Sequence, residues 1–392
     1  MNNPLRQSWV TLSCLQLSGA LSLPMIMIGF YLGRHYSWQQ SLVEIFAGNL
    51  CLFLLAAGYM RVIEVKKQVT IAFAQTLLGN KGAYWGAAGL VLSLLGWSAI
   101  QIHLLAATTG QPAGTILLSI VFIYLLTFRN FAFLTRANLL ILPFLCTSLL
   151  YLLWMLPAAP TPIFFVEVQP FKIGLLMVIT AGSGLVFDLP TFFRHATTLR
   201  DARLALALIF LLGLPAIQGL GLYLAQHTAN QASWVAGFLS SFSLPALVFL
   251  MLSGLSGACL NLYSASMVLQ RLLGYSYAKL LFVLCCLSGL LALVNLEEHF
   301  SFFLEFINLN AEIMTVLLWV YVGFKGIELP APGRAQEKAH QIIFFMVLGY
   351  AACSAFFHRS VTHDLFIDVA LISSVLMVCY YRMGEKNARA RR

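Results

Sequence analysis

Apolar runs long enough to cross a lipid bilayer follow one another along almost the whole chain, and they limit the fold more than any other feature. A transmembrane helix needs about 20 predominantly apolar residues. The hydrocarbon core holds no water for the backbone, and these runs are too long and uniform for barrel strands, so each is expected to be a helix. About twelve runs can be read, near 10–33, 41–60, 83–109, 113–128, 138–156, 173–193, 204–225, 237–270, 280–296, 300–324, 341–357 and 365–381. The sequence therefore predicts an all-α polytopic membrane protein with about twelve transmembrane helices.

Composition excludes a soluble globular protein. Of the 392 residues, 60% are hydrophobic and only 9% are charged, with a mean hydropathy of +0.86, whereas soluble domains carry roughly 25% charged residues. The net charge of +9 does not indicate a nucleic-acid partner, because the charges lie in short loops between apolar runs. The eight cysteines lie within or at the ends of these runs without metal-type spacing, which is typical of small buried apolar side chains.

The distribution of lysine and arginine predicts the orientation. Cytoplasmic loops of membrane proteins carry an excess of both residues. If the N-terminus is cytoplasmic, all of the 23 Lys and Arg residues fall on the cytoplasmic side except Arg34, Lys172 and Arg359. We therefore expect a multi-pass protein of the cell (inner or plasma) membrane with both termini in the cytoplasm. The first helix lacks a small-residue cleavage site after it and is interpreted as uncleaved.

A polar linker divides the chain into a large and a small part. Residues 326–340, "GIELPAPGRAQEKAH", contain two prolines and follow ten of the predicted helices. We expect residues 1–325 to form a ten-helix core. Residues 341–392 should then supply two extra helices and a basic cytoplasmic tail.

Two of the predicted helices are interrupted in a similar way. The first carries "LSGALSLP", Leu17–Pro24, and the sixth carries "TAGSGLVFDLP", Thr180–Pro190. Gly and Pro free backbone groups in mid-membrane, which is tolerated where the backbone lines a cavity. Matching interruptions in the first helix of each five-helix half indicate a transporter built from inverted repeats, here about 10–156 and about 173–325. The alternative is that Gly and Pro are simply frequent in membrane helices.

Serines accompany both interruptions. Ser18 and Ser22 lie at the first and Ser183 at the second. Together with freed carbonyls they could bind a substrate or a cation. Alternatively, each could cap the end of a broken helix.

The stretch "GWSAIQ" places Trp97 and Gln101 four residues apart in an apolar run, so the two side chains share one helix face. Membrane tryptophans usually lie at the interface, whereas Trp97 falls near the centre of its span. Packing for Trp97 and an interhelical hydrogen bond for Gln101 are the structural alternatives. The pair also suits a flat solute, because stacking on an aromatic ring contributes about 1–3 kcal/mol per base.

Four stretches carry a resemblance to a known family. They are "EIFAGNLCLFLLAAGYM", "QTLLGNKGAYWGAAGLVLSLLGWSAIQ", "LPTFFRHATTLRDARLA" and "NLYSASMVLQRLLG". Their order and spacing over roughly residues 10–275 resemble the nucleobase–cation symporter-1 family, most closely its cytosine permease branch. The resemblance implies a LeuT-type fold of five plus five inverted helices with two C-terminal helices, and cation-driven import of a small heterocycle. It also implies that Trp97 stacks on the substrate, that Gln101 hydrogen-bonds its edge and that Asn261 lies near the site.

The chain departs from the family at several pocket positions. Leu94 replaces a glutamine of the cytosine branch, and Gly182-Ser183-Gly184 lacks the second stacking ring. Ser256-Gly257 retains only one hydroxyl of those that would bind sodium. We expect the substrate site to comprise Trp97, Gln101, Asn261, Ser22, Gly182 and Ser183, and cation coupling to use Ser18, Ser256 and Glu312.

Glu312 is an acidic residue inside a predicted span. "FFLEFINLNAEIMTVLLWVYV" places Glu305, Asn308 and Glu312 on one helix face, with Glu312 near mid-membrane. An intramembrane carboxylate is a functional hypothesis by default, because burying its charge is expensive. We expect Glu312 to carry a coupling proton, the alternative being a structural role, and the coupling ion stays open between Na⁺ and H⁺. For Asp188 and Arg194, an ion pair or gate competes with simple exposure at the interface.

These observations favour a secondary active transporter, a cation-coupled symporter that imports a nucleobase or related heterocycle by alternating access. A LeuT-type carrier for an amino acid or vitamin precursor is the alternative, ahead of a membrane sensor or enzyme. We expect no enzyme, because the sequence shows neither paired catalytic groups at a membrane face nor a phosphate-binding Gly-Lys-Ser/Thr loop. The expected partners are a small-molecule substrate and the lipid bilayer, with no nucleic acid, cofactor or bound metal.

Overall fold

The computed structural model describes residues 6–66, 69–107, 109, 112–129, 131–155, 171–227 and 234–294, with isolated positions beyond residue 342. Apart from one isolated parallel bridge between Gln7 and Ala196, the secondary structure of these ranges is helical. The helices are α1 (Trp9–Ala20), α2 (Leu23–His35), α3 (Trp38–Lys66), α4 (Thr70–Ala107), α5 (Pro112–Phe128), α6 (Phe131–Met155), α7 (Phe171–Phe187), α8 (Leu189–Phe193), α9 (Leu199–Ala207), the π-helix η1 (Leu208–Gly213), α10 (Leu214–His227), α11 (Trp234–Leu273) and α12 (Tyr277–Ala292). The predicted span near 300–324, the linker 326–340 and Glu312 lie outside the described residues, as do the two extra C-terminal helices predicted near 341–357 and 365–381 except for a few single positions.

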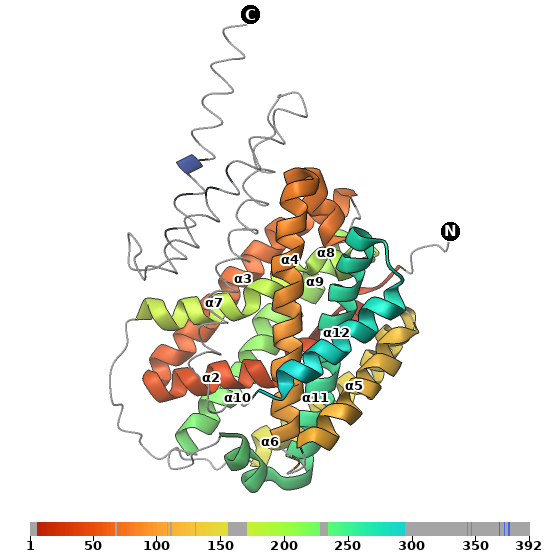
Figure 1. Ribbon diagram of the computed structural model, residues 1–392. Helices are drawn as coiled ribbons and strands as arrows, with labels where there is room; N and C mark the ends of the chain where they lie inside the picture. The colour runs from red at the N-terminus through yellow and green to blue at the C-terminus, as the bar shows by residue number, and fades with distance from the viewer. Residues whose placement is uncertain are drawn as a thin grey trace, which may run out of the picture.

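The described helices form a bundle around α4 and α11 (Figure 1). Among the described residues, six helical spans are long and apolar enough to cross a membrane, and the bent pair of α1 and α2 is a seventh candidate. The helices α5 and α12 are also apolar but shorter. The prediction of an all-helical multi-pass membrane protein is confirmed.

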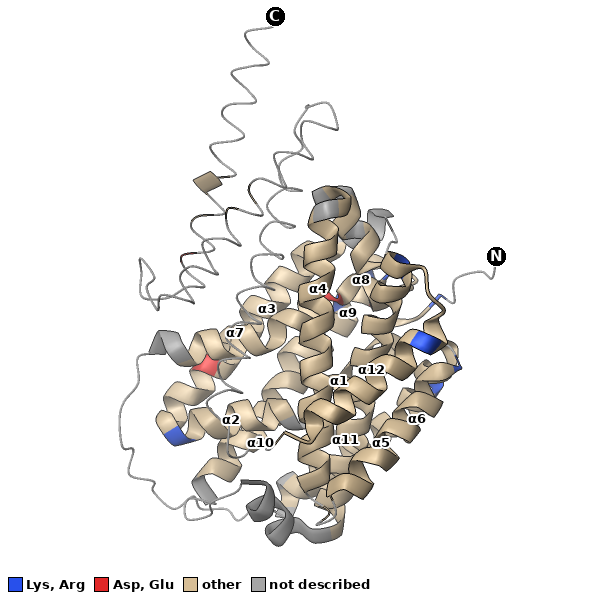
Figure 2. Ribbon diagram, viewed as in Figure 1, with Lys and Arg blue, Asp and Glu red and all other residues tan. Residues whose placement is uncertain are grey.

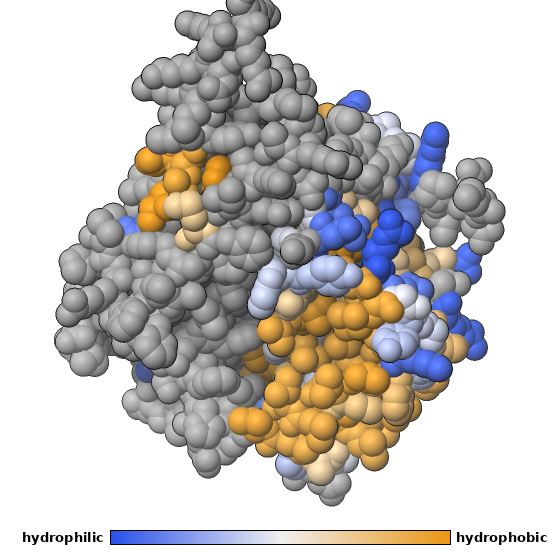
Figure 3. All heavy atoms as spheres, turned by 45° about the horizontal axis from the view of Figure 1, so that its top comes forward, coloured by the Kyte–Doolittle hydropathy of each residue, from blue (hydrophilic) through white to orange (hydrophobic). Residues whose placement is uncertain are grey.

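The outer surface of the bundle is apolar. Leu118 is 71% exposed, Leu140 70% and Trp154 78%, and Figure 3 shows a broad hydrophobic area on the described part of the surface. Soluble monomers rarely expose apolar patches of this kind. These side chains therefore suit a lipid environment.

The first membrane-crossing element is broken at the predicted place. The helices α1 and α2 meet at an angle of 58°. Leu21 and Ser22, which lie between the two helices, have non-helical backbone angles. Pro24 lies in the first turn of α2. Proline suits the start of a helix, because the amide hydrogen that it lacks would have no partner there. Turn-type hydrogen bonds close the interruption, because Leu21 N donates to the Leu17 carbonyl oxygen and Ser22 N to the Ala20 carbonyl oxygen, both at 2.8 Å.

The second predicted interruption lies later in the chain than the glycine motif suggested. The helix α7 runs unbroken through Gly182-Ser183-Gly184, and the break falls at Asp188 (φ −86°, ψ 2°), just before Pro190 in the first turn of α8. Neighbouring helices hold the glycine stretch in helical form. A Cβ at Gly182 would lie 2.3 Å from Leu52 Cδ1, so the missing side chain leaves room for α3 to pack closely.

Two helices approach each other backbone to backbone. A Cβ at Gly29 of α2 would lie 1.8 Å from the Gln218 carbonyl oxygen of α10, and one at Gly221 of α10 would lie 2.0 Å from the Ile26 carbonyl oxygen of α2. Small residues permit such contacts in membrane proteins. Figure 1 shows α2 and α10 side by side. The contact holds α2, the second half of the broken element, against α10.

Candidate functional site

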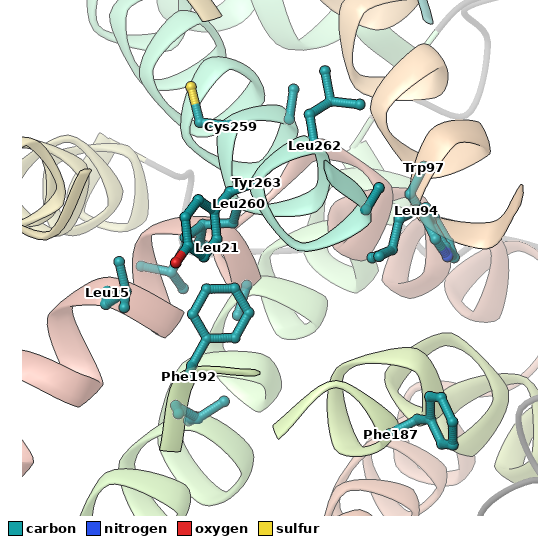
Figure 4. Close-up of a cluster of buried hydrophobic side chains, with 14 of the residues drawn as sticks. Leu15, Leu21, Leu94, Trp97, Phe187, Phe192, Cys259, Leu260, Leu262 and Tyr263 are labelled. Atoms are coloured by element: carbon teal, nitrogen blue, oxygen red, sulfur yellow. The ribbon is translucent and has the colours of Figure 1, made fainter. Parts of the chain in front are cut away.

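A cavity of about 90 Å³ lies at the two helix interruptions, with room for several water molecules. Its walls come from α1, α2, α4, α7, α8, α10 and α11. Figure 4 shows part of the apolar wall, with Leu94 and Trp97 on α4, Leu260 on α11 and Phe192 on α8. The polar side chains that line the cavity are Gln16, Ser22, Ser93, Gln101, Asp188 and Asn261.

Trp97 and Gln101 both line the cavity, on the shared helix face that the sequence predicted. Their side chains are buried. The carboxamide of Gln101 lies against the backbone of α11, since a Cβ at Gly257 would be 2.4 Å from Gln101 Nε2 and 2.6 Å from Oε1. Gln101 Oε1 is buried without a hydrogen-bond partner within the described residues. It is therefore an acceptor that a bound solute or water can satisfy.

Two further polar side chains of the cavity were missed by the sequence analysis. Gln16 Nε2 on α1 and Ser93 Oγ on α4 are buried, and neither has a hydrogen-bond partner in the described part of the chain. The signal for Gln16 was the same as for Gln101, an amide within an apolar run. Ser93 lies one turn before Trp97 and shares its helix face. With Gln101 they place a donor, an acceptor and a hydroxyl around one space.

The other predicted substrate residues divide into two groups. Ser22 and Asn261 line the cavity. Gly182 and Ser183 do not belong to its lining, because Gly182 faces Leu52 and the Ser183 hydroxyl donates to the Thr180 carbonyl oxygen at 2.7 Å. Gly184 on the same helix does line the cavity, and the nearest atom to a Cβ placed there would be Ser93 Oγ at 3.9 Å.

The two serines predicted for cation coupling lie together. Ser18 Oγ on α1 and Ser256 Oγ on α11 both donate to Asn138 Oδ1 on α6, the second at 2.6 Å. All three side chains are buried, and Asn138 Nδ2 donates to the Leu134 carbonyl oxygen at 2.9 Å. The sequence analysis missed Asn138, which joins the two serines. Within the searched, described residues, no group of three His, Cys, Asp or Glu could hold a metal ion.

Two acidic side chains are buried rather than exposed. Asp188 is 4% exposed, lines the cavity and accepts hydrogen bonds from Thr70 Oγ1 at 3.1 Å and Thr191 Oγ1 at 2.7 Å. The expected alternative of exposure at the interface is therefore wrong for Asp188. Glu44 on α3 is fully buried against Gly174 and accepts a hydrogen bond from Gln40 Nε2 at 3.0 Å.

The chain after α8 packs against α6 and the N-terminal segment. The His195 ring stacks on Phe131 with 4.7 Å between centroids. Burial, together with the charge of Arg194, lowers the pKa of His195 to about 4, so the ring is neutral at pH 7. The N-terminal segment crosses this place, where Gln7 N donates to the His195 carbonyl oxygen at 2.8 Å and Thr197 N donates to the Gln7 carbonyl oxygen at 2.9 Å. These contacts tie the N-terminal segment to the chain that follows α8.

No protein-family model and no curated protein sequence matches this chain. Solved structures do match it along almost its whole length. Mhp1, a nucleobase-cation-symport-1 family transporter in a closed conformation with bromovinylhydantoin bound, has a TM-score of 0.75 at 14% identity, over 98% of this chain and 94% of that chain. A Na⁺-coupled sialic acid symporter has a TM-score of 0.67 at 11% identity, over 97% and 91%. A manganese transporter of Eremococcus coleocola has a TM-score of 0.59 at 11% identity, over 97% and 95%. The chain therefore shares the fold of these membrane transporters.

Proposed function

We propose that this protein is a secondary active transporter, a cation-coupled symporter that imports a nucleobase or a related small heterocycle by alternating access. The observation that carries the proposal is the cavity at the helix interruptions, where Trp97 lies beside polar atoms that have no hydrogen-bond partner in the described part of the chain. The fold shared with cation-coupled transporters supports it. By this proposal the chain is a divergent relative of the nucleobase–cation symporter-1 family.

The chemistry of the cavity suits a flat solute with hydrogen-bonding edges. The Trp97 ring offers a face for stacking, Gln101 Oε1 an acceptor and Gln16 Nε2 a donor. An unsatisfied buried polar group costs about 1–3 kcal/mol, which a solute with matching donors and acceptors recovers. Ser22 and Asn261 complete the proposed substrate site.

The proposed coupling rests on a second group of residues. Ser18 and Ser256, joined by Asn138, place oxygen atoms of three helices together beside the broken element. Glu312, which lies outside the described residues, is also proposed as a proton carrier. The proposed coupling ion is Na⁺ or H⁺. The proposed architecture keeps the five-plus-five repeat with two extra helices and places both termini in the cytoplasm.

A carrier for another small solute is the second candidate. Gly184 favours it, because its helix face opens into the cavity where a second stacking ring would otherwise fill space. A solute without an aromatic ring, such as an amino acid, could use that space. The fold also occurs in a sialic acid symporter, whose named substrate is not a nucleobase.

The test is uptake by the purified protein in liposomes. Nucleobases, nucleosides, hydantoins and amino acids would be offered under imposed Na⁺ or H⁺ gradients. We expect concentrative uptake of at least one planar heterocycle. Trp97→Ala should weaken its binding about fivefold or more, because the lost stacking is worth about 1–3 kcal/mol.

Trp85→Ala is the matched control for that variant. Trp85 lies on the same helix as Trp97 but is 61% exposed at the outer surface, so its removal should leave uptake intact. Uptake of amino acids alone would favour the second candidate. Failure of every solute in the panel to cross the membrane would contradict the transporter proposal.

A further inference from the structure

Asp188 is a buried carboxylate that the proposed substrate and coupling residues do not use. It lies between α7 and α8, where the helix is interrupted, and it borders the cavity. Its side chain is 4% exposed. An ionised carboxylate is expensive to bury in a membrane protein, and such residues are typically functional. The neutral acid form avoids that cost, so the site can gain or lose a proton.

The immediate contacts of Asp188 are hydroxyl groups. Thr191 Oγ1 donates to Asp188 Oδ1 at 2.7 Å and Thr70 Oγ1 donates at 3.1 Å. The two threonine hydroxyls lie 3.0 Å apart, and Ser264 Oγ of α11 lies 3.5 Å from Thr191 Oγ1. A hydroxyl can donate or accept by rotating about its C–O bond. This shell can therefore satisfy the carboxylate as donors and the carboxylic acid as acceptors.

The charged and titratable groups that face Asp188 are few in the described part of the chain. Arg194, after α8, acts on it through its charge, and Tyr263 of α11 hydrogen-bonds Arg194. His195 adjoins Arg194 and is neutral at pH 7. From α4 the contact is Thr70. Burial favours the acid, whereas the hydroxyl donors and then the charge of Arg194 favour the carboxylate, so these influences oppose each other.

We propose that Asp188 is a proton-binding site whose occupancy is coupled to solute binding in the cavity. The carboxylate takes a proton from hydronium in the cavity water, forming a carboxyl O–H bond and leaving a water molecule. An uncharged solute that displaces cavity water removes solvent from Asp188, which favours the neutral acid. By linkage, a protonated Asp188 then favours the bound solute to the same extent. The inference rests on the proposed transporter function and assigns the binding of H⁺, one of the two proposed coupling ions, to Asp188.

The first test needs no solute. Infrared difference spectra between acidic and alkaline pH, recorded on the full protein in lipid, report the carbonyl stretch of protonated carboxylic acids. We expect a pH-dependent acid band that Asp188→Asn removes and that Asp188→Glu shifts. Glu44→Gln is the matched control, since Glu44 is buried away from the cavity lining, and it should leave that band in place. A spectrum that Asp188→Asn leaves unchanged would overturn the proposal.

The second test measures the coupling with a solute from the uptake panel that binds. Tryptophan fluorescence should show about tenfold tighter binding at acidic than at alkaline pH, within the usual range of coupling between sites. Asp188→Asn, which resembles the protonated form, should bind with the acidic-pH affinity throughout. It should exchange solute across the membrane but lose accumulation driven by a proton gradient.

The two tests separate the two proposals. Proton-driven accumulation by Asp188→Asn at the level of the unaltered protein would overturn the proton site and leave the transporter proposal standing. If no solute of the panel binds, the transporter proposal fails, while the infrared band still decides whether Asp188 binds a proton. Asp188→Glu keeps a carboxyl group at this position. Comparing it with Asp188→Asn shows whether a change comes from the lost acid or from a loss of folding.

Discussion

Gly257 is a residue whose missing side chain fixes the position of Gln101. A Cβ at Gly257 would lie 2.4 Å from Gln101 Nε2, and the atoms in its way form the flexible end of a side chain. We therefore expect Gly257→Ala to fold normally while moving the Gln101 carboxamide away from its place in the cavity. Solute affinity should fall about fivefold or more, as the loss of a buried hydrogen bond of about 1–3 kcal/mol implies.

Binding of the panel solute and thermal unfolding, measured on the same preparation, check this prediction. Gly58→Ala is the control, because a Cβ there meets no atom within 4 Å. It should change neither quantity. Unchanged affinity in Gly257→Ala would show that the position of Gln101 does not matter for binding.

At the residue scale, the sequence reveals polar or bulky side chains within apolar runs. It does not reveal whether such a side chain is buried or lines a cavity. Trp97 and Gln101 could be predicted because a large ring and an amide in mid-span are unusual, and both line the cavity. Asp188 stood near a charged residue and so resembled an interfacial group, yet it is buried. The difference depends on α4 and α11, distant in sequence, whose hydroxyls surround it.

At the element scale, the contact between α2 and α10 should be the least tolerant of added volume. A Cβ at Gly221 would lie 2.0 Å from one backbone atom of α2 and 2.8 Å from another, so only movement of a whole helix can relieve it. We expect Gly221→Ala to destabilise the protein by at least about 1–3 kcal/mol, the usual cost of overpacking. Gly219→Ala, on the same helix with no atom within 4 Å, should be neutral or slightly stabilising, because alanine favours a helix more than glycine does.

Unfolding in mixed detergent micelles, followed by circular dichroism, compares the two alanine variants. Equal stabilities would mean that α2 and α10 do not depend on their backbone contact. The sequence analysis did not predict this contact, although Gly29 and Gly33 of α2 have the four-residue spacing typical of close helix pairs. It could not name α10 as the partner, because that choice depends on the path of the broken element.

Of the two helix interruptions, the sequence located one correctly and misplaced the other. Gly19 and Pro24 marked the first break correctly, because proline limits where a helix can begin. The glycines at 182 and 184 misplaced the second, because glycine permits a break without requiring one. Tertiary packing of α7 against α3 decided that this stretch stays helical.

At the scale of the whole molecule, charge is distributed unevenly over an otherwise apolar bundle. Figure 2 shows most of the Lys and Arg on one side of the described helices, with a separate cationic site at the end of α2, where Arg34 lies. The sequence predicted this asymmetry from loop charges alone, because chain connectivity forces successive loops to alternate between the two membrane faces. The orientation of the bundle in a cell remains a prediction of that argument.

Reporter fusions would test the orientation. Alkaline phosphatase is active only outside the cytoplasm, and green fluorescent protein exported in an unfolded state does not fluoresce. We expect phosphatase activity from a fusion after Tyr36, between α2 and α3, and fluorescence from a fusion after Tyr275, between α11 and α12, because the Lys and Arg near the second loop hold it in the cytoplasm. The reverse pattern would contradict the predicted orientation, in which both termini lie in the cytoplasm.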